Sequence, residues 1–259
     1  EFIAGDEQAF ADIMNQVAQK LGMTRTQFKN ATGLPNEGHY TTAKDLSLLA
    51  RALIRDFPEH YKVYKEKYFS YNDIRQANRN SLLWRDDAVD GMKTGHTQAA
   101  GFCLVASAEK KELRLISVVM GATSERSRST ESQKLINYGF RYFESVKLYD
   151  GLESLRRVKV WGGLHESLDV GIEAPARLTI PTGARGALAA EVTLDPVIKA
   201  PVSQGQTLGL LRISLEGETL LERPVVALNG VDEAGLVSSL IDEVSLFFLS
   251  LFSGDPLAL

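Results

Sequence analysis

Two apolar runs separated by a short charged segment place the strongest constraint on the fold. The runs cover residues 101–106 and 113–120, and Glu109-Lys110-Lys111-Glu112 stands between them. Apolar runs of this length on either side of a polar turn predict two antiparallel strands joined as a hairpin. Residues 89–97, just before the hairpin, hold one lysine, two threonines and two glycines. We therefore expect Lys93-Thr94-Gly95 on or just before a strand, where a glycine lets a ligand approach the backbone closely.

Helical periodicity is present on both sides of this hairpin. Apolar residues recur at helical spacing over residues 2–21, with no clear capping residue before them and Gly22 as the expected stop. A second helix should begin after Thr42 and end near Pro58, because the residue before a proline disfavours helical geometry. Residues 121–129 read as a loop that carries Arg128. A third helix should follow this loop.

The composition changes near residues 146–154, which predicts a domain boundary. From residue 158 onward, short apolar or alternating runs are punctuated by glycine and proline, as is typical of a small all-β sandwich or barrel. We therefore divide the chain into residues 1–148, residues 149–232 and a terminal segment of residues 233–259.

The terminal segment from Gly235 to Phe252 has helical periodicity with one apolar face. Its charged residues argue against a helix that spans a bilayer. We favour an amphipathic helix that lies in the membrane surface. A helix that packs in the core or between subunits is the alternative, and the lack of Lys or Arg after Arg223 supports it.

Charge and cysteine content exclude several kinds of site. The formal net charge is −4 with Lys and Arg scattered, so no nucleic acid is expected as a partner. Cys103 is the single cysteine and lies in an apolar run, where a buried, inert thiol is expected. The four histidines are too far apart for a zinc site, so we expect no metal and no cofactor. The tyrosine- and lysine-rich residues 61–73 favour an exposed strand or linker over a sugar or nucleic-acid surface.

The order of motifs resembles one known family. Val89-Asp90-Gly91-Met92 precedes Lys93-Thr94-Gly95, and His96-Thr97 follows it. Upstream stand residues 28–34 (FKNATGL) and 40–45 (YTTAKD). With the β-rich part and the terminal helix, this order resembles the low-molecular-mass penicillin-binding proteins, the D-alanyl-D-alanine carboxypeptidases of the penicillin-binding-protein-5 type. The resemblance implies an incomplete α/β transpeptidase-like domain, made of an antiparallel sheet with helices, followed by a small all-β sandwich and an amphipathic helix.

The superfamily has two further motifs, a Ser-x-x-Lys and a Ser-x-Asn-type triplet. By the resemblance, both lie N-terminal to the helix with which this chain begins. We expect neither in these residues. The chain would then be a truncated family member that lacks the nucleophile, its lysine partner and the second-motif serine, and that is inactive by itself.

The resemblance also assigns roles to residues of this chain. Lys93 would add positive charge near the substrate carboxylate and the nucleophile, and Thr94 would offer that carboxylate its hydroxyl. The backbone N–H of His96 would be one oxyanion donor, and we favour a bystander role for its imidazole over tuning of the pH dependence. Arg128 resembles the arginine that helps to hold the terminal carboxylate, with Arg79 as a second candidate. Gly95 completes the substrate-binding strand.

The activity implied is a serine-type D-Ala-D-Ala carboxypeptidase, which removes the terminal D-alanine of peptidoglycan pentapeptides through an acyl-enzyme and is trapped by β-lactams. The family works in the bacterial periplasm at the inner-membrane surface. Two alternatives stay open: a β-lactamase-like hydrolase, and a non-catalytic module that binds cell wall or membrane.

Overall fold

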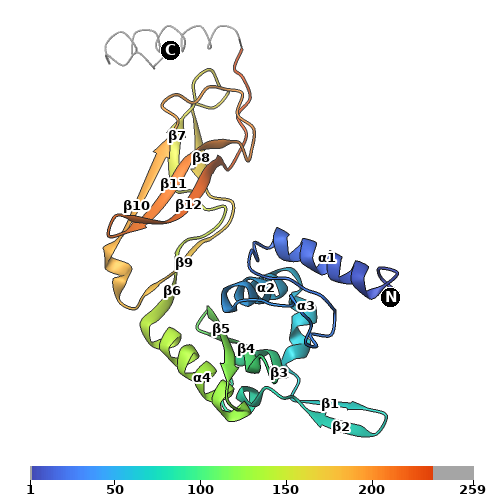
Figure 1. Cartoon of the computed structure of the whole chain (residues 1–259). Helices are drawn as coiled ribbons and strands as arrows, with labels where there is room; N and C mark the ends of the chain where they lie inside the picture. The colour runs from blue at the N-terminus through green and yellow to red at the C-terminus, as the bar shows by residue number, and fades with distance from the viewer. Residues whose placement is uncertain (1, 236–259) are drawn as a thin grey trace. The chain divides into compact units, whose positions relative to one another are not determined.

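The computed structural model describes residues 2–235. The chain divides between Phe143 and Glu144 into two compact units, which we call the N-terminal and the C-terminal unit (Figure 1). The helix predicted from Gly235 to Phe252 lies outside the described residues, apart from Gly235 itself. Within the described part of the chain, every helix is too short or too polar to cross a membrane.

The N-terminal unit is built on a three-stranded antiparallel sheet. Its strands are β3 (Val89–Thr97), β4 (Gly101–Lys110) and β5 (Leu113–Ala122), in the order β3-β4-β5. The predicted hairpin is confirmed, and the predicted placement of Lys93-Thr94-Gly95 on a strand is confirmed with it. Because β4 lies in the centre, β3 forms one edge of this sheet.

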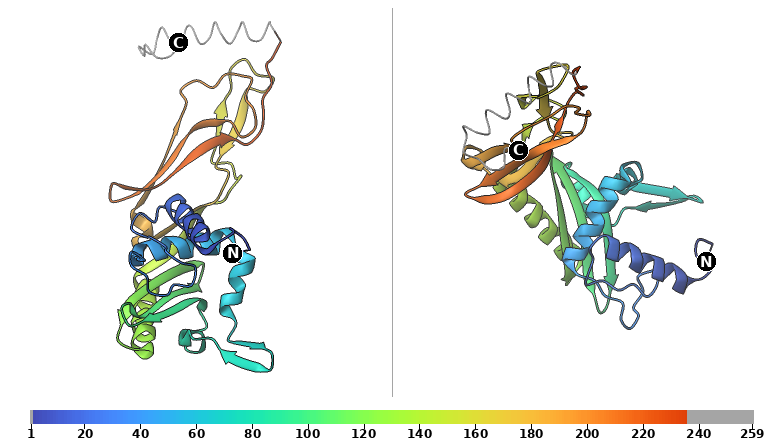
Figure 2. Two further views of the ribbon diagram at one scale, coloured as in Figure 1. Left: turned by 45° about the vertical axis from the view of Figure 1, so that its right-hand side comes forward. Right: turned by 90° about the horizontal axis from the view of Figure 1, so that it is seen from above.

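The helices of the N-terminal unit are α1 (Glu7–Lys20), α2 (Ala43–Asp56), α3 (Pro58–Tyr61) and α4 (Glu125–Tyr142), with the short 3₁₀ helices η1 (Lys62–Lys65) and η2 (Ser81–Trp84). α4 packs against β4 and β5, and α2 packs mainly against β5 (Figure 2). Separate apolar clusters form, one around Leu104 and Ile136 and another around Ala50 and Met92. On β4, Leu104 and Ala106 belong to the first cluster and Val105 packs against the second. Because successive strand residues point to opposite faces, the two clusters fill the two sides of the sheet.

Local capping residues set where these helices begin. Thr42 caps α2 by accepting a hydrogen bond from the Asp45 N–H, and α2 ends at Asp56, so both predictions are confirmed. The expectation of an uncapped helix over residues 2–21 is wrong. The helix begins at Glu7, where the Asp6 side chain accepts a hydrogen bond from the Ala9 N–H at 2.7 Å.

The third predicted helix, α4, differs from its prediction in where it begins and in which residues it exposes. Ser124 caps α4, so Arg128 lies in the first turns of the helix and the predicted loop over residues 121–129 is wrong. Leu135 is half exposed, although the periodicity placed it on the apolar face. Gly139 allows α4 to approach the sheet, because a Cβ there would stand 2.5 Å from the Leu115 side chain.

Residues 68–77 form a separate two-stranded hairpin, β1 (Tyr68–Tyr71) and β2 (Ile74–Ala77). Every residue of both strands is exposed, which confirms the expectation of an exposed strand. Contacts anchor one face of the hairpin: Tyr68 meets Trp84 edge-on, and the Arg75 guanidinium lies over the Tyr68 ring.

The C-terminal unit contains two sheets around one apolar core. One sheet has the order β10-β11-β12-β8-β7, and β6 pairs with β9 in the other. Both sheets contribute residues to the core, which confirms the predicted all-β sandwich. The sequence did not predict β8, because its short run is mostly polar. The strands, with one 3₁₀ helix, are β6 (Phe143–Tyr149), β7 (Arg156–Lys159), β8 (Ser167–Gly171), β9 (Ala176–Pro181), η3 (Ala184–Ala187), β10 (Leu188–Leu194), β11 (Thr207–Leu215) and β12 (Glu218–Ala227).

Candidate functional site

The edge strand β3 changes from buried to exposed in its middle. Val89 and Met92 are buried, whereas Lys93, Gly95 and His96 are exposed and Thr94 is half buried. Within residues 2–235, β3 pairs with β4 alone, so its other edge keeps unpaired backbone groups. The strand therefore presents a cation, a hydroxyl and an open backbone edge over four consecutive residues. These groups can bind a carboxylate and an extended peptide.

An ionic cluster holds the buried half of β3. Asp90 accepts hydrogen bonds from the Tyr61 hydroxyl at 2.8 Å and from the Arg114 guanidinium at 2.7 Å. Arg114 also bonds the Ser107 hydroxyl. Gly91 is required beside this cluster, because a Cβ there would stand 2.5 Å from the Tyr61 oxygen. Burial raises the pKa of the Tyr61 phenol above its usual value, so this hydroxyl stays a hydrogen-bond donor at neutral pH.

Asn80 also holds the buried half of β3 in place. Its side chain is almost fully buried, and Nδ2 donates to the Gly91 carbonyl at 2.9 Å. Oδ1 accepts the Leu82 N–H and so caps η2. One side chain therefore links the start of η2 to the buried half of β3 and holds the exposed half in place.

The exposed side chains of β3 have specific contacts. Lys93 donates to the backbone carbonyl of Thr94. The His96 ring stacks on Phe102 with a centroid separation of 3.8 Å, and Nδ1 lies 3.1 Å from the Gly101 carbonyl oxygen. The imidazole is thus held against the neighbouring strand. The bystander role of the ring and the oxyanion role of the His96 N–H both stay predictions.

Arg128 reaches β3 from α4. Its side chain is only 2% exposed. Its terminal nitrogens lie 3.4 Å from the Gly95 carbonyl and 3.4 Å from the Arg79 carbonyl. A third contact, to the Glu125 carboxylate, is 3.2 Å long, and Nε has no partner among the described residues. The structure therefore brings Arg128, the Arg79 backbone and Gly95 together, whereas the Arg79 residue itself is exposed.

These contacts leave Arg128 with unused hydrogen-bonding capacity. Bonds of 3.4 Å are long for N–H donors to oxygen, and a buried guanidinium usually satisfies all its donors. An anion at the Gly95 end of β3 would supply the missing acceptors. The role of Arg128 in holding a carboxylate stays a prediction.

The expectation that neither serine motif occurs is wrong, because both residue spacings are present in the sequence. Ser107 stands three residues before Lys110, and Ser70 stands two residues before Asn72. Ser107 is fully buried on the central strand β4, and its hydroxyl accepts a bond from Arg114. Residues three apart on a strand point to opposite faces, so Lys110 cannot act on Ser107. Ser70 and Asn72 lie in the exposed β1–β2 hairpin, so neither spacing forms a nucleophile site.

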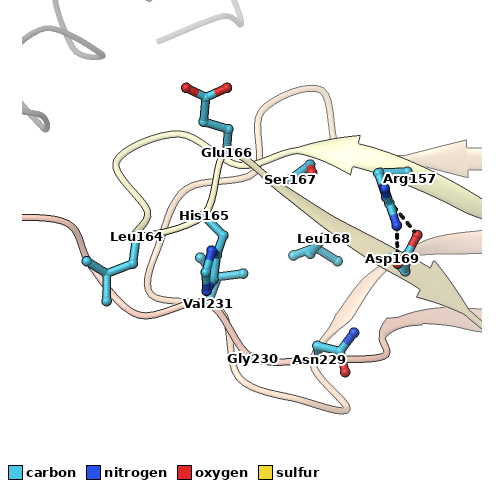
Figure 3. Close-up of a pocket in the computed structure, with 10 residues that line it drawn as sticks. All are labelled: Arg157, Leu164, His165, Glu166, Ser167, Leu168, Asp169, Asn229, Gly230 and Val231. Carbon is cyan, nitrogen blue, oxygen red and sulfur yellow. Dashed lines mark hydrogen bonds and ion pairs between the residues drawn. The ribbon is translucent and has the colours of Figure 1, made fainter.

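The rest of residues 2–235 offers no second catalytic site. A cavity of about 560 Å³ in the C-terminal unit is lined by His165, Ser167 and Asn229, with an Arg157–Asp169 ion pair at one end (Figure 3). No hydrogen bond joins His165 to Ser167, so the cavity lacks a nucleophile activated by a base. Among residues 2–235, no group of three or more His, Cys, Asp and Glu side chains could hold a metal ion. Cys103 is half buried and its Sγ lies 3.4 Å from the Ala100 carbonyl, so the thiol is less buried than expected.

Sequence reasoning missed the residues that hold β3 in place. Tyr61 and Arg114 were not singled out, although they are the partners of Asp90. Asn80 was missed as well. The available signals were Asp90 directly before the Lys-Thr-Gly strand and an asparagine directly before an apolar run. Neither signal identifies its partner, because the contacts span 11 to 29 positions.

Comparison with known proteins shows the family to which the chain belongs. Residues 1–124 match the family model for D-alanyl-D-alanine carboxypeptidase, and residues 143–233 match the model for the C-terminal domain of penicillin-binding protein 5. The chain is 42% identical over 250 residues to D-alanyl-D-alanine carboxypeptidase DacC of Escherichia coli, covering 96% of this chain and 62% of that protein. DacA of the same organism is 40% identical with the same coverage.

A solved structure shows the same relationship. Penicillin-binding protein 5 of Haemophilus influenzae is 38% identical and superposes with a TM-score of 0.78, over 90% of this chain and 69% of that one. The fold is therefore that of the serine penicillin-binding proteins. The chain belongs to the D-alanyl-D-alanine carboxypeptidase family of the penicillin-binding-protein-5 type. It spans 62% of the length of the two curated E. coli relatives.

Proposed function

We propose that the whole protein is a serine-type D-Ala-D-Ala carboxypeptidase, which removes the terminal D-alanine of peptidoglycan pentapeptides through an acyl-enzyme. The observation that carries the proposal is the exposed Lys93-Thr94-Gly95 edge of β3 with the buried Arg128 beside it. Family membership supports this assignment, because the relatives DacC and DacA are named D-alanyl-D-alanine carboxypeptidases.

In this proposal the described residues perform recognition and charge stabilisation. The Lys93 ammonium and the Thr94 hydroxyl bind the substrate carboxylate. Arg128 adds positive charge at the Gly95 end, and Arg79 is a second cation for the same group. The His96 N–H stabilises the oxyanion. The serine nucleophile and its lysine base come from a Ser-x-x-Lys outside these residues, because acyl transfer needs a serine activated by an adjacent base.

The same proposal gives the partners and the location. β-Lactams carry a carboxylate and a reactive amide, so they would bind along β3 and acylate the same serine. We place the protein in the periplasm, on the inner-membrane surface, with the segment from Gly235 to Phe252 as the attachment. The cell wall would then lie within reach of the site.

A labelled penicillin tests the proposal in two arms. The 259-residue chain should take up no covalent label, because neither Ser107 nor Ser70 has a base in reach. The gene product that includes the residues upstream of Glu1 should contain a Ser-x-x-Lys, become labelled and release D-alanine from a pentapeptide. A start codon near Glu1 would instead favour a non-catalytic binding module. Rapid hydrolysis of the penicillin without release of D-alanine would favour a β-lactamase.

A further inference from the structure

The outer edge of β7 in the C-terminal unit opens into a cleft. β7 is the last strand of its sheet. Directly after it, the edge is occupied: the Trp161 N–H donates to the Ile198 carbonyl at 2.9 Å, and the Ala200 N–H donates to the Trp161 carbonyl at 2.8 Å. Before Trp161 the two segments separate. They enclose a cleft of about 330 Å³ between β7 and residues 194–198.

The strand register directs two sets of backbone groups into this cleft. The Val160 N–H donates to the Glu166 carbonyl, on the side of β8, whereas Trp161 bonds on the opposite side. Backbone groups of an antiparallel strand alternate in direction. Arg157 and Lys159 are in phase with Trp161, so their N–H and C=O groups point outward. No backbone partner outside the ladder is present for them among residues 2–235.

The side chains beside this open edge are cationic and aromatic. Arg157 donates to Asp169 across the β7–β8 pair, so its charge is already matched (Figure 3). The Lys159 ammonium lies 3.4 Å from the centre of the Trp161 ring, and Arg156 is exposed. The cleft therefore has Lys159 and Arg156, which form no ion pair among the described residues, and an indole at its closed end. Asp195 also lines it, so three cations and one carboxylate surround the cleft.

This positive charge is local, because the C-terminal unit as a whole carries a negative net charge. Residues 144–235 hold nine Lys and Arg and thirteen Asp and Glu, a net charge of −4, yet β7 has three cations in four residues. A cationic edge strand also prevents pairing between copies of the same edge. Pairing with the β7 edge of a second copy is thus unfavourable, whereas an acidic segment of another protein is favoured because its charge is opposite.

We propose that the β7 edge is a docking site for an extended acidic peptide segment of a partner protein. The segment adds to the sheet as a further strand and bonds the outward groups of Arg157 and Lys159. Its acidic side chains lie on alternate positions and face Lys159, whereas Arg156 lies on the opposite face of β7. Strand addition of this kind takes its affinity from backbone bonds and its specificity from side chains on alternate positions. A membrane surface could attract the cations, but it could not form hydrogen bonds with the outward N–H and C=O groups in the manner of a strand.

A labelled peptide of about seven residues that alternates glutamate and valine tests the site on the whole chain. We expect binding measurable below about 1 mM, the weak end of peptide recognition. Backbone amide exchange at Arg157 and Lys159 should slow when the peptide is present. Lys159→Glu should weaken binding at least about tenfold, the effect of a like charge in a contact. Arg156→Glu, on the opposite face of β7, should have a smaller effect. Arg185→Glu, an exposed cation elsewhere in the unit, should leave it unchanged.

Three results would overturn the proposal. One is no binding up to about 1 mM by the folded chain. Another is equal binding by the same peptide with alternate backbone nitrogens methylated, which would show attraction by charge alone. The third is binding to anionic lipid vesicles that depends on Lys159 and Arg156 while the peptide does not bind. Circular dichroism of each variant separates loss of the site from loss of the fold.

Discussion

Asn80→Ala should destabilise the N-terminal unit by about 2–4 kcal/mol. The side chain is 1% exposed and makes two kinds of contact, the bond to the Gly91 carbonyl and the cap of η2. Leaving a buried carbonyl without its partner costs about 1–3 kcal/mol. Loss of a capping side chain costs about 1 kcal/mol. The two losses act on separate atoms of the same residue, so we add them.

Urea unfolding followed by fluorescence measures this effect. The chain has two tryptophans, so a Trp161→Phe background leaves Trp84, at the end of η2, as the reporter of the N-terminal unit. Asn80→Asp keeps the acceptor for the Leu82 N–H and loses the donor to Gly91. It should be at least as destabilising as alanine, because a buried carboxylate would face a carbonyl.

The exposed Asn36 supplies the matched control, and Asn36→Ala should change the free energy of unfolding by less than about 0.5 kcal/mol. An Asn80→Ala protein within about 0.5 kcal/mol of the parent would refute the claim that this side chain holds β3.

Three further predictions concern the elements around the site. Thr42→Ala should lower the free energy of unfolding by about 1 kcal/mol in a urea titration, because α2 loses its cap, whereas Thr42→Ser should not. The hydrogen bond from the Thr26 hydroxyl lowers the pKa of the Asp45 carboxyl. Asp45 therefore stabilises the fold above its ordinary pKa near 4, and this contribution is lost as the pH falls through the lower folded pKa; Asp45→Asn should flatten that part of a stability–pH curve. Gly139→Ala should destabilise the parent by about 1 kcal/mol through crowding against Leu115, yet stabilise a Leu115→Ala background by a similar amount through helix propensity, in a double-mutant cycle.

Each of these predictions has a contrary result. Equal loss of stability in the alanine and serine variants at position 42 would show that size and not capping matters. Parallel stability–pH curves for the parent and Asp45→Asn would show that this carboxyl does not titrate with unfolding. The same sign of effect for Gly139→Ala in both backgrounds would show that Leu115 does not set the helix–sheet distance.

Local patterns predicted the elements that depend on local physics. The charged turn at Glu109-Lys110-Lys111-Glu112 marked the β4–β5 hairpin, because apolar runs beside a polar turn have few other solutions. Thr42 marked the start of α2, since a cap is a contact between near neighbours. The Lys-Thr-Gly strand was placed correctly, and its exposed edge follows from the position of β3 in the sheet.

Long-range contacts could not be predicted in the same way. Arg128 was expected in a loop, but Ser124 caps the helix early and turns Arg128 inward beneath Gly95. The Ser124 cap could be predicted from the sequence, whereas the inward direction of the Arg128 side chain depends on where α4 packs. The pairing of Tyr61 with Asp90 depends likewise on how α3 meets β3. β8 was missed because strand Ser167–Gly171 is held by its neighbours and not by an apolar run of its own.

The most direct test of the account is the rate of acylation by a labelled penicillin in the full-length gene product with Lys93→Ala. The account predicts a rate lower by on the order of 100-fold, because the variant loses the positive charge that binds the carboxylate and lies near the nucleophile. Lys110→Ala, an exposed lysine on the neighbouring strand, should acylate at the parental rate. A Lys93→Ala protein that acylates as fast as the parent would contradict the assignment of β3 as the recognition strand.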